Sequence, residues 1–107
     1  MKDYEIWIEA EAWAPGDWVP TNTNSDVVVT RDDGSIWTAT FFSYEHIAEL
    51  RRGYQDTGEC LHGRYFWATN MILVDAVTRE RVEEVVADLM ATREFESAFD
   101  GPHEPAV

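Results

Sequence analysis

The sequence contains a single cysteine, Cys60, in 107 residues. One cysteine cannot form a disulfide within its own chain, so nothing in the composition argues for an oxidising compartment. The chain begins without a charged start followed by an apolar segment, and we therefore expect no secretory signal. No apolar run reaches the roughly 20 residues of a membrane helix. These absences together predict a cytoplasmic protein.

Basic residues are also scarce, because eight Lys and Arg stand against 21 Asp and Glu, which gives a formal net charge of −13. Phosphate binding needs clustered Lys and Arg, so we expect neither nucleic acid nor an anionic membrane as a partner. A basic protein is the expected partner of such a surface, since opposite potentials steer encounter. The alternative interpretation is that the charge only keeps the protein soluble.

Sequence motifs of catalysis and cofactor binding are missing as well. The chain has no glycine-rich phosphate loop and no ligand pair at Cys-x-x-Cys or His-x-x-x-His spacing. Cys60 and His62 resemble a thiolate and its base, but their spacing supplies no third group to orient the base. We therefore expect a protein that is not an enzyme, with no catalytic residue, no cofactor and no metal site.

What the sequence does contain is a 45% hydrophobic composition with five Trp, which suits one hydrophobic core. Residues 65–74, YFWATNMILV, form an uncharged run of aromatic and aliphatic side chains in this acidic chain. Ten such residues without Gly or Pro are typical of a strand buried on both faces. We expect this run to be the interior strand of a sheet, with neighbours on both sides.

Residues 4–13 alternate between two kinds of side chain, which predicts a strand with one core face. Ile6 and Ile8 lie on the core side. The other side combines carboxylates with large indoles, namely Glu5, Trp7, Glu9, Glu11 and Trp13. Side chains of these two kinds are found at the rims and centres of interfaces, and we predict that these five residues bind the partner.

A hairpin follows, because Asp33-Gly34 stands between two stretches rich in β-branched and aromatic residues. A three-residue loop places Gly34 in the left-handed region and pairs residues 26–30 with residues 35–42. Two pairs of side chains then share a core face, namely Val29 with Trp37 and Val27 with Ala39.

Two helices are expected. Ser43 is the N-cap of the first helix, and Gly53 is a natural stop for it. Thr78 caps the second helix, whose apolar stripe comprises Val82, Val85, Val86, Leu89 and Met90. Phe95, Ala98 and Phe99 indicate one more helical turn against the body.

The expected fold is therefore a single α+β domain over residues 1–107, with a flexible tail at 102–107. The element order β-β-β-α-β-α predicts a four-stranded, mostly antiparallel sheet with two helices packed on one face. The second face of this sheet has an excess of apolar side chains. Either the long connection at residues 14–25 and the tail cover that face, or a partner does.

Two stretches carry a resemblance, TGECLHGRYFWATNMILVD at residues 57–75 and DVVVTRDDGSIWTATFFSYEHI at residues 26–47. They resemble a group of small acidic bacterial proteins of uncharacterised function. In size, acidity and aromatic content the chain is also similar to immunity proteins, which neutralise bacterial toxins by direct binding. This second similarity is one of class and carries no diagnostic motif.

The leading functional hypothesis is a protein-binding module, an immunity or inhibitor protein that neutralises a basic bacterial toxin. The first alternative is a small-molecule-binding or enzymatic domain with a pocket near Cys60, His62 and Trp67. The second alternative is a structural homodimer in which two apolar sheet faces cover each other.

Overall fold

Five strands form one sheet in the computed structural model, which describes residues 3–104. The strands are β1 (Tyr4–Ile8), β2 (Asn24–Arg31), β3 (Ile36–Ser43), β4 (Met71–Val74) and β5 (Asp100–His103). β1, β2 and β3 pair antiparallel in sequence order. β4 runs parallel to β3, and β5 pairs antiparallel with another stretch of β3. The α+β class and the mostly antiparallel sheet are confirmed, whereas the expected four strands are five.

The helices are α1 (Tyr44–Thr57), α2 (Glu59–Gly63), α3 (Arg79–Thr92) and α4 (Phe95–Ala98), and a short 3-10 helix, η1, covers Glu9–Ala12. The caps expected for the two long helices are confirmed. The Ser43 hydroxyl accepts the backbone N–H of His46, and the Thr78 hydroxyl accepts that of Arg81. The hydroxyls thus bond N–H groups of the first turn that have no carbonyl partner within the helix.

The hairpin between β2 and β3 has the predicted loop and register. Gly34 has a φ of 85°, which suits a residue without a Cβ, and the Arg31 backbone N–H donates to the carbonyl of Ser35 at 2.9 Å. Val29 opposes Trp37 and Val27 opposes Ala39, and all four side chains are buried. β3 pairs with three other strands and is therefore the centre of the sheet.

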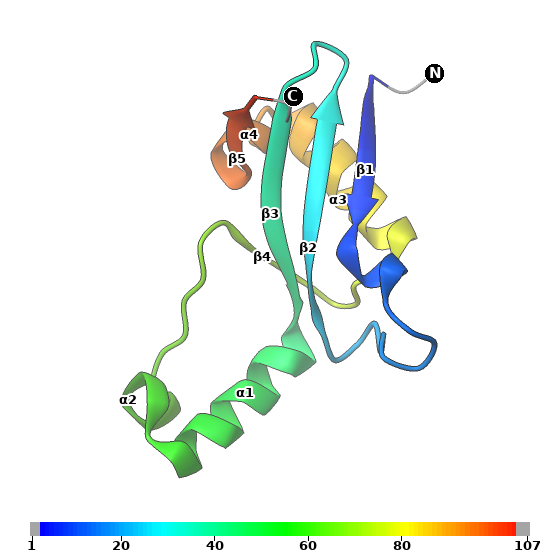
Figure 1. Ribbon diagram of the computed structural model, residues 1–107. Coiled ribbons are helices and arrows are strands. Elements are labelled where there is room, and N and C mark those ends of the chain that lie inside the picture. Colours follow the sequence, from blue (N-terminus) through cyan, green and yellow to red (C-terminus); the bar gives the residue numbers. More distant parts are fainter. Residues whose placement is uncertain (1–2, 105–107) are drawn as a thin grey trace.

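The core lies between this face of the sheet and α3, which crosses it from behind in Figure 1. Val82 and Val86 of the predicted stripe are fully buried, and Val85, Leu89 and Met90 pack against the core. The predicted turn at residues 95–99 is α4, and its aromatic rings extend the core. The Phe95 ring centroid lies 5.5 Å from that of Trp37 and 4.5 Å from that of Phe99.

β1 is shorter than the alternating pattern predicts, because the chain leaves the extended conformation after Ile8 and forms η1. Continued pairing would set Glu9 directly opposite Asp26, since Ile8 opposes Val27. Like charges facing each other across a strand pair are destabilising. The buried Ser25 hydroxyl instead accepts the backbone N–H of Ala10 at 3.0 Å and holds η1 against β2.

The expectation of an interior strand over residues 65–74 is wrong. Only Met71–Val74 is a strand, and it pairs with β3 alone, at an edge of the sheet. Its even-numbered residues face the core, where Val74 is buried and Ile72 packs, whereas Leu73 is exposed. Phe66, earlier in the run, stacks on Tyr54 of α1 with ring centroids 6.3 Å apart. The uncharged run therefore divides its apolar side chains between a helix and the sheet.

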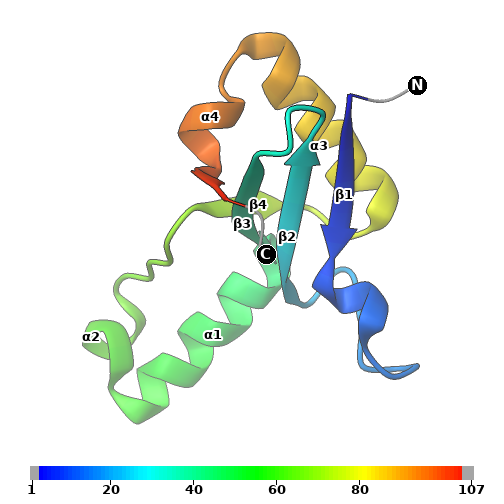
Figure 2. The ribbon, with the colours of Figure 1, turned by 45° about the horizontal axis from the view of Figure 1, so that its top comes forward.

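The first helix also differs from expectation, because α1 continues past Gly53 and ends at Gly58, which has a φ of 89°. α1 buries no residue fully and extends away from the sheet with α2, so the expected packing of both long helices on one face is wrong (Figures 1 and 2). We call residues 44–68 the lobe. The lobe makes the molecule elongated. The Cα radius of gyration is 15.0 Å, against about 13 Å for a compact domain of this length.

The connection at residues 14–25 packs on the core side of the sheet, where Trp18 lies against the core. The Trp18 indole N–H donates to the carbonyl of Val77 at 2.9 Å, and the Val77 N–H donates to the carbonyl of Pro20 at 2.7 Å. These bonds fasten the connection to the segment between β4 and α3. At the C-terminal end, Pro102 and His103, where the tail was expected to begin, belong to β5, and residues 105–107 lie outside the described residues.

Candidate binding site

The face of the sheet opposite α3 is the first candidate site. Among residues 3–104 no helix crosses this face in the two views of Figures 1 and 2. We call it the open face, and its side chains on β1, β2 and β3 are those of Glu5, Trp7, Asn24, Asp26, Val28, Thr30, Ile36, Thr38, Thr40 and Phe42. Phe42, at the end of the face, is buried and its ring lies against that of Phe66. The other residues are not buried, and Trp7 is 51% exposed. An uncovered indole of this size is a feature of interaction surfaces.

Strand register arranges this face in rows. Trp7 opposes Val28, Val28 opposes Thr38, and Thr38 opposes Asp100 of β5. Residues that oppose each other across neighbouring strands project from the same face, so an indole and a carboxylate stand at the two ends of one row. Asp26 lies two residues from Val28 on the same face, in a neighbouring row with Thr40.

A groove of about 330 Å³ runs along these rows. It is lined by Trp7, Asp26, Val28, Thr38, Ala39, Thr40, Thr69, Asn70 and Asp100. Its outer end lies where the edge of β3 changes partner, because β5 pairs with it as far as Thr38 and β4 begins at Thr40. Ala39 of β3 lies between these two paired stretches and lines the groove.

Asn70 fixes the outer wall of the groove. It has a φ of 49°, in the left-handed region that Asn tolerates better than most residues. Its backbone carbonyl accepts the N–H of Thr40 at 3.1 Å, and its side-chain amide donates to the carbonyl of Ala98 at 3.2 Å. These bonds connect β3, the start of β4 and the end of α4, so the wall is set by three elements distant in sequence.

The groove is acidic, and among residues 3–104 no basic residue lines it. Asp26 accepts a hydrogen bond from the Thr40 hydroxyl at 3.1 Å through one carboxylate oxygen. Asp100 lies 2.9 Å from the Nε2 atom of His103 through one oxygen. Among the described residues, no Lys or Arg forms an ion pair with either carboxylate. The groove therefore combines an apolar wall and a β-sheet floor with negative charge that no described Lys or Arg neutralises.

The structure separates the five residues predicted to bind the partner. Glu5 and Trp7 lie on the open face, because they belong to β1. Glu9 and Glu11 lie in η1, and Trp13 packs against the core, so the five do not share one surface. The five residues share one face only if the strand is regular throughout, and β1 ends at Ile8.

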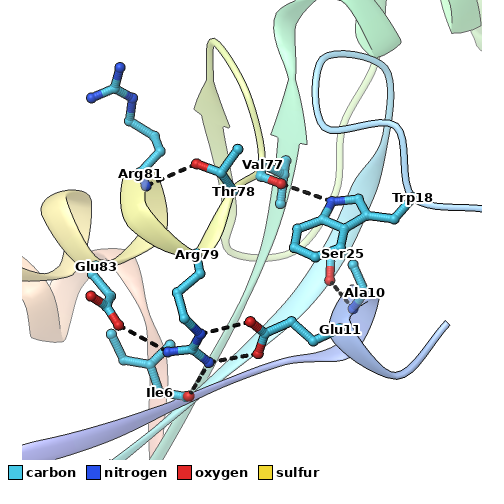
Figure 3. Close-up of polar contacts among 10 residues, drawn as sticks. All are labelled: Ile6, Ala10, Glu11, Trp18, Ser25, Val77, Thr78, Arg79, Arg81 and Glu83. Atoms are coloured by element: carbon cyan, nitrogen blue, oxygen red, sulfur yellow. Dashed lines mark hydrogen bonds and ion pairs between the residues drawn. The ribbon is translucent and has the colours of Figure 1, made fainter. Parts of the chain in front are cut away.

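Glu11 has an internal partner, which Figure 3 shows. The Nε and Nη2 atoms of Arg79 donate to its two carboxylate oxygens, each at 2.7 Å. These hydrogen bonds hold the pKa of Glu11 below its usual value. The carboxylate of Glu11 therefore stabilises the fold and is partly neutralised as a contact for other molecules.

Two groove residues, Asp26 and Asp100, were not among the predicted site residues. For Asp26 a signal exists, because the hairpin register places it on the same face as Val28 and Thr40. Asp100 carries no such signal, since the Gly101-Pro102 sequence that follows it is typical of a loop rather than a strand. Pairing of β5 with β3 brings Asp100 to the groove.

The pocket proposed near Cys60, His62 and Trp67 has no counterpart in the groove, which lies on the open face. Cys60, Leu61 and His62 form a turn with positive φ values of 52°, 52° and 57°. The His62 ring lies 3.4 Å from the carbonyl of Gln55, and Trp67 is 70% exposed. Within residues 3–104, no group of three or more His, Cys, Asp and Glu side chains is placed to hold a metal ion.

Comparison with known proteins finds no matching family model, no matching curated protein and no matching solved structure. In the described part of the chain, every helix is too short or too polar to cross a membrane.

Proposed function

We propose that the protein binds a basic protein partner through its open face, as an immunity or inhibitor protein that neutralises a basic bacterial toxin by direct contact. The observation that carries this proposal is the half-exposed Trp7 at a groove whose lining, in the described part of the chain, contains carboxylates and no Lys or Arg. Aromatic side chains with a large exposed area supply much of the binding energy at interface centres.

The net charge of −13 supports a basic partner over an acidic or neutral one. Negative charge distributed around an aromatic centre steers the encounter and sets its salt dependence. Glu5 and Asp26 have this role on the open face, because both are exposed. Glu11 contributes less than the sequence pattern suggests, since Arg79 neutralises it.

The test uses the protein as bait in a lysate of the organism that encodes it, with mass spectrometry of the retained proteins. Two site variants, Trp7→Ala and Asp26→Lys, are compared with two controls that make the same changes elsewhere, Trp67→Ala and Asp88→Lys. Trp67 lies in the lobe, and Asp88 is an exposed residue of α3 on the other side of the sheet. A partner of the open face is basic, is retained by the wild type and both controls, and is lost from the two site variants.

Titration of that partner then separates the contribution of the Trp7 side chain from that of the charge on Asp26. Trp7→Ala should weaken binding by about 2 kcal/mol or more, as expected for a buried aromatic anchor. Asp26→Lys should mainly slow association and reduce its dependence on salt. Circular dichroism checks that each variant is folded.

The other outcomes contradict the proposal. A partner that is acidic, or that is retained equally by all variants, would not use the open face. A stable homodimer in sedimentation equilibrium that Trp7→Ala dissociates would show that a second copy covers this face instead.

A further inference from the structure

The indole of Trp7 is exposed at the groove of the open face. Indole is the best aromatic partner of a cation, which is attracted to the ring face within about 6 Å of its centroid. Within residues 3–104 the single cation over a ring is Arg31, which lies 5.6 Å from the Phe95 centroid on the core side of the sheet. Trp7 is 51% exposed and lines the groove, so its ring is open to a cation from outside the chain.

Asp26 is placed to hold the charge of that cation. It lies on β2 two residues from Val28, the cross-strand partner of Trp7, which is a separation of about 7 Å along the strand. Thr40 binds one of its carboxylate oxygens and fixes the group, and the other oxygen forms no hydrogen bond in the described part of the chain. Asp100, at the far end of the groove, adds negative potential.

Of the two basic side chains, arginine suits this groove better. Its guanidinium is planar, stacks on an aromatic face and is more weakly hydrated than an ammonium group. It can therefore lie flat on the indole while its edge donates hydrogen bonds to a carboxylate. The lysine ammonium is a compact, strongly hydrated charge and loses more hydration on entering a hollow with an apolar wall.

We propose that the open-face groove is an arginine-binding site, in which a guanidinium stacks on Trp7 and pairs with Asp26 while Asp100 strengthens the local negative potential. This inference rests on the proposed function, in that the arginine belongs to the basic partner, and it names the contact at the centre of that interface.

The test needs no partner. Three capped peptides, acetyl-Gly-Arg-Gly-amide and its lysine and citrulline counterparts, are titrated into the ¹⁵N-labelled protein and followed by NMR. Citrulline has the shape of arginine without its charge. We expect the arginine peptide to shift the Trp7 indole signal and the backbone amides of residues 26–28 and 38–40. The lysine peptide should bind more weakly, and the citrulline peptide should not saturate.

Variants assign the contacts. Trp7→Leu and Asp26→Asn should each weaken the arginine peptide about fivefold, the equivalent of about 1 kcal/mol for a cation–π contact or an exposed ion pair. Asp100→Asn should weaken it less, because Asp100 acts through the potential. Trp67→Leu and Asp88→Asn are the matched controls and should leave binding unchanged. Spectral dispersion shows whether each variant is folded, and the comparison of the three peptides on the wild type does not depend on any variant.

The inference is overturned if the citrulline peptide binds as tightly as the arginine peptide, or if the shifts concentrate in the lobe. Its failure is distinct from failure of the proposed function. Arginine binding in the groove without any captured basic protein would contradict the proposed function and leave the groove assignment standing. If a captured basic partner depends on Trp7 but the arginine peptide causes no shifts in the groove, the proposed function is supported and the groove assignment is overturned.

Discussion

Arg79, the first residue of α3, binds both carboxylate oxygens of Glu11, 68 residues earlier in the chain, with two nitrogen atoms each 2.7 Å away. The same guanidinium donates to the carbonyl of Ile6 at 2.8 Å and to Glu83 at 3.0 Å. One side chain therefore connects β1, η1 and α3 (Figure 3). This contact holds the end of the first strand, and with it the position of Trp7, against the helix behind the sheet.

Arg79→Met should lower the free energy of unfolding by about 1–2 kcal/mol, because it removes charge-assisted hydrogen bonds from a partly exposed network. Urea denaturation measures the loss. Arg52→Met is the control, since Arg52 is exposed on α1, and it should change stability by less than about 0.5 kcal/mol. Equal effects of the two substitutions would show that the network contributes nothing.

Glu11 should make stability depend on pH in acid. Its pKa in the folded protein is lowered from 4.5 by the Arg79 hydrogen bonds. A lowered folded pKa means that the stabilisation is complete above the unfolded pKa and is lost as the pH falls through the folded pKa. The stability advantage of the wild type over Glu11→Gln, about 1 kcal/mol at pH 7, should therefore decrease below about pH 4.5.

The measurement is urea denaturation of both proteins between pH 7 and pH 3. Glu49→Gln, at an exposed position of α1, gives the background change for loss of a carboxylate. If the stability advantage of the wild type over Glu11→Gln instead grows as the pH falls, the pKa of Glu11 is not lowered in the folded protein.

Neighbouring residues of β4 should respond in opposite ways to a carboxylate. Ile72 opposes the fully buried Phe41 and packs against the core, so Ile72→Asp should cost about 3 kcal/mol or more and unfold much of the protein. Leu73 points to the other face and is exposed, so Leu73→Asp should cost less than about 1 kcal/mol. Thermal unfolding followed by circular dichroism distinguishes them, and equal melting temperatures would refute this orientation of β4.

Two glycines of the lobe should also differ. A Cβ at Gly63 would lie 2.6 Å from the backbone carbonyl oxygen of Arg51, at a φ of 78°, so Gly63→Ala should destabilise the lobe by about 2 kcal/mol or more. A Cβ at Gly53 meets nothing within 4 Å, inside a helix, so Gly53→Ala should stabilise by about 0.5–1 kcal/mol.

Hydrogen exchange of the backbone amides shows which region of the protein each of the two glycine substitutions destabilises. Gly63→Ala should accelerate exchange in α1 and α2 and leave β1 and residues 27–30 of β2 unchanged, because the lobe meets the sheet at the end of β3, where His46 and Phe66 pack against Phe42. Acceleration throughout the sheet would mean that the lobe and the core unfold together.

Cys60→Ser should leave both the fold and partner binding unchanged, with a stability change below about 0.5 kcal/mol. Cys60 forms no disulfide, and it lies in the lobe rather than in the groove. Titration of the partner and urea denaturation check this. Loss of an activity in this variant, with an intact fold, would support the alternative of an enzymatic or small-molecule-binding pocket near Cys60, His62 and Trp67.

Short-range chemistry was enough to predict several elements of the fold. Asp33-Gly34 predicts the hairpin with its register, because a tight turn fixes which residues oppose each other. Ser43 and Thr78 predict the starts of both long helices, since a cap acts on N–H groups three residues away. The apolar stripe of α3 predicts which face of this helix packs against the core, because residues three and four positions apart lie on the same side of a helix.

Contacts between distant segments decided the rest. The run at residues 65–74 is uniform in composition, yet Phe66 packs on α1 while Ile72 packs on the sheet, and only the partners tell them apart. The alternation of residues 4–13 ends at Ile8 because the next residue would oppose Asp26, which belongs to another strand. The groove likewise depends on β4 and β5 meeting different stretches of β3. The sequence by itself thus determined the acidity, the hairpin and the helix starts, which depend on neighbours along the chain, whereas the open face and its groove arose only from strand pairing across it.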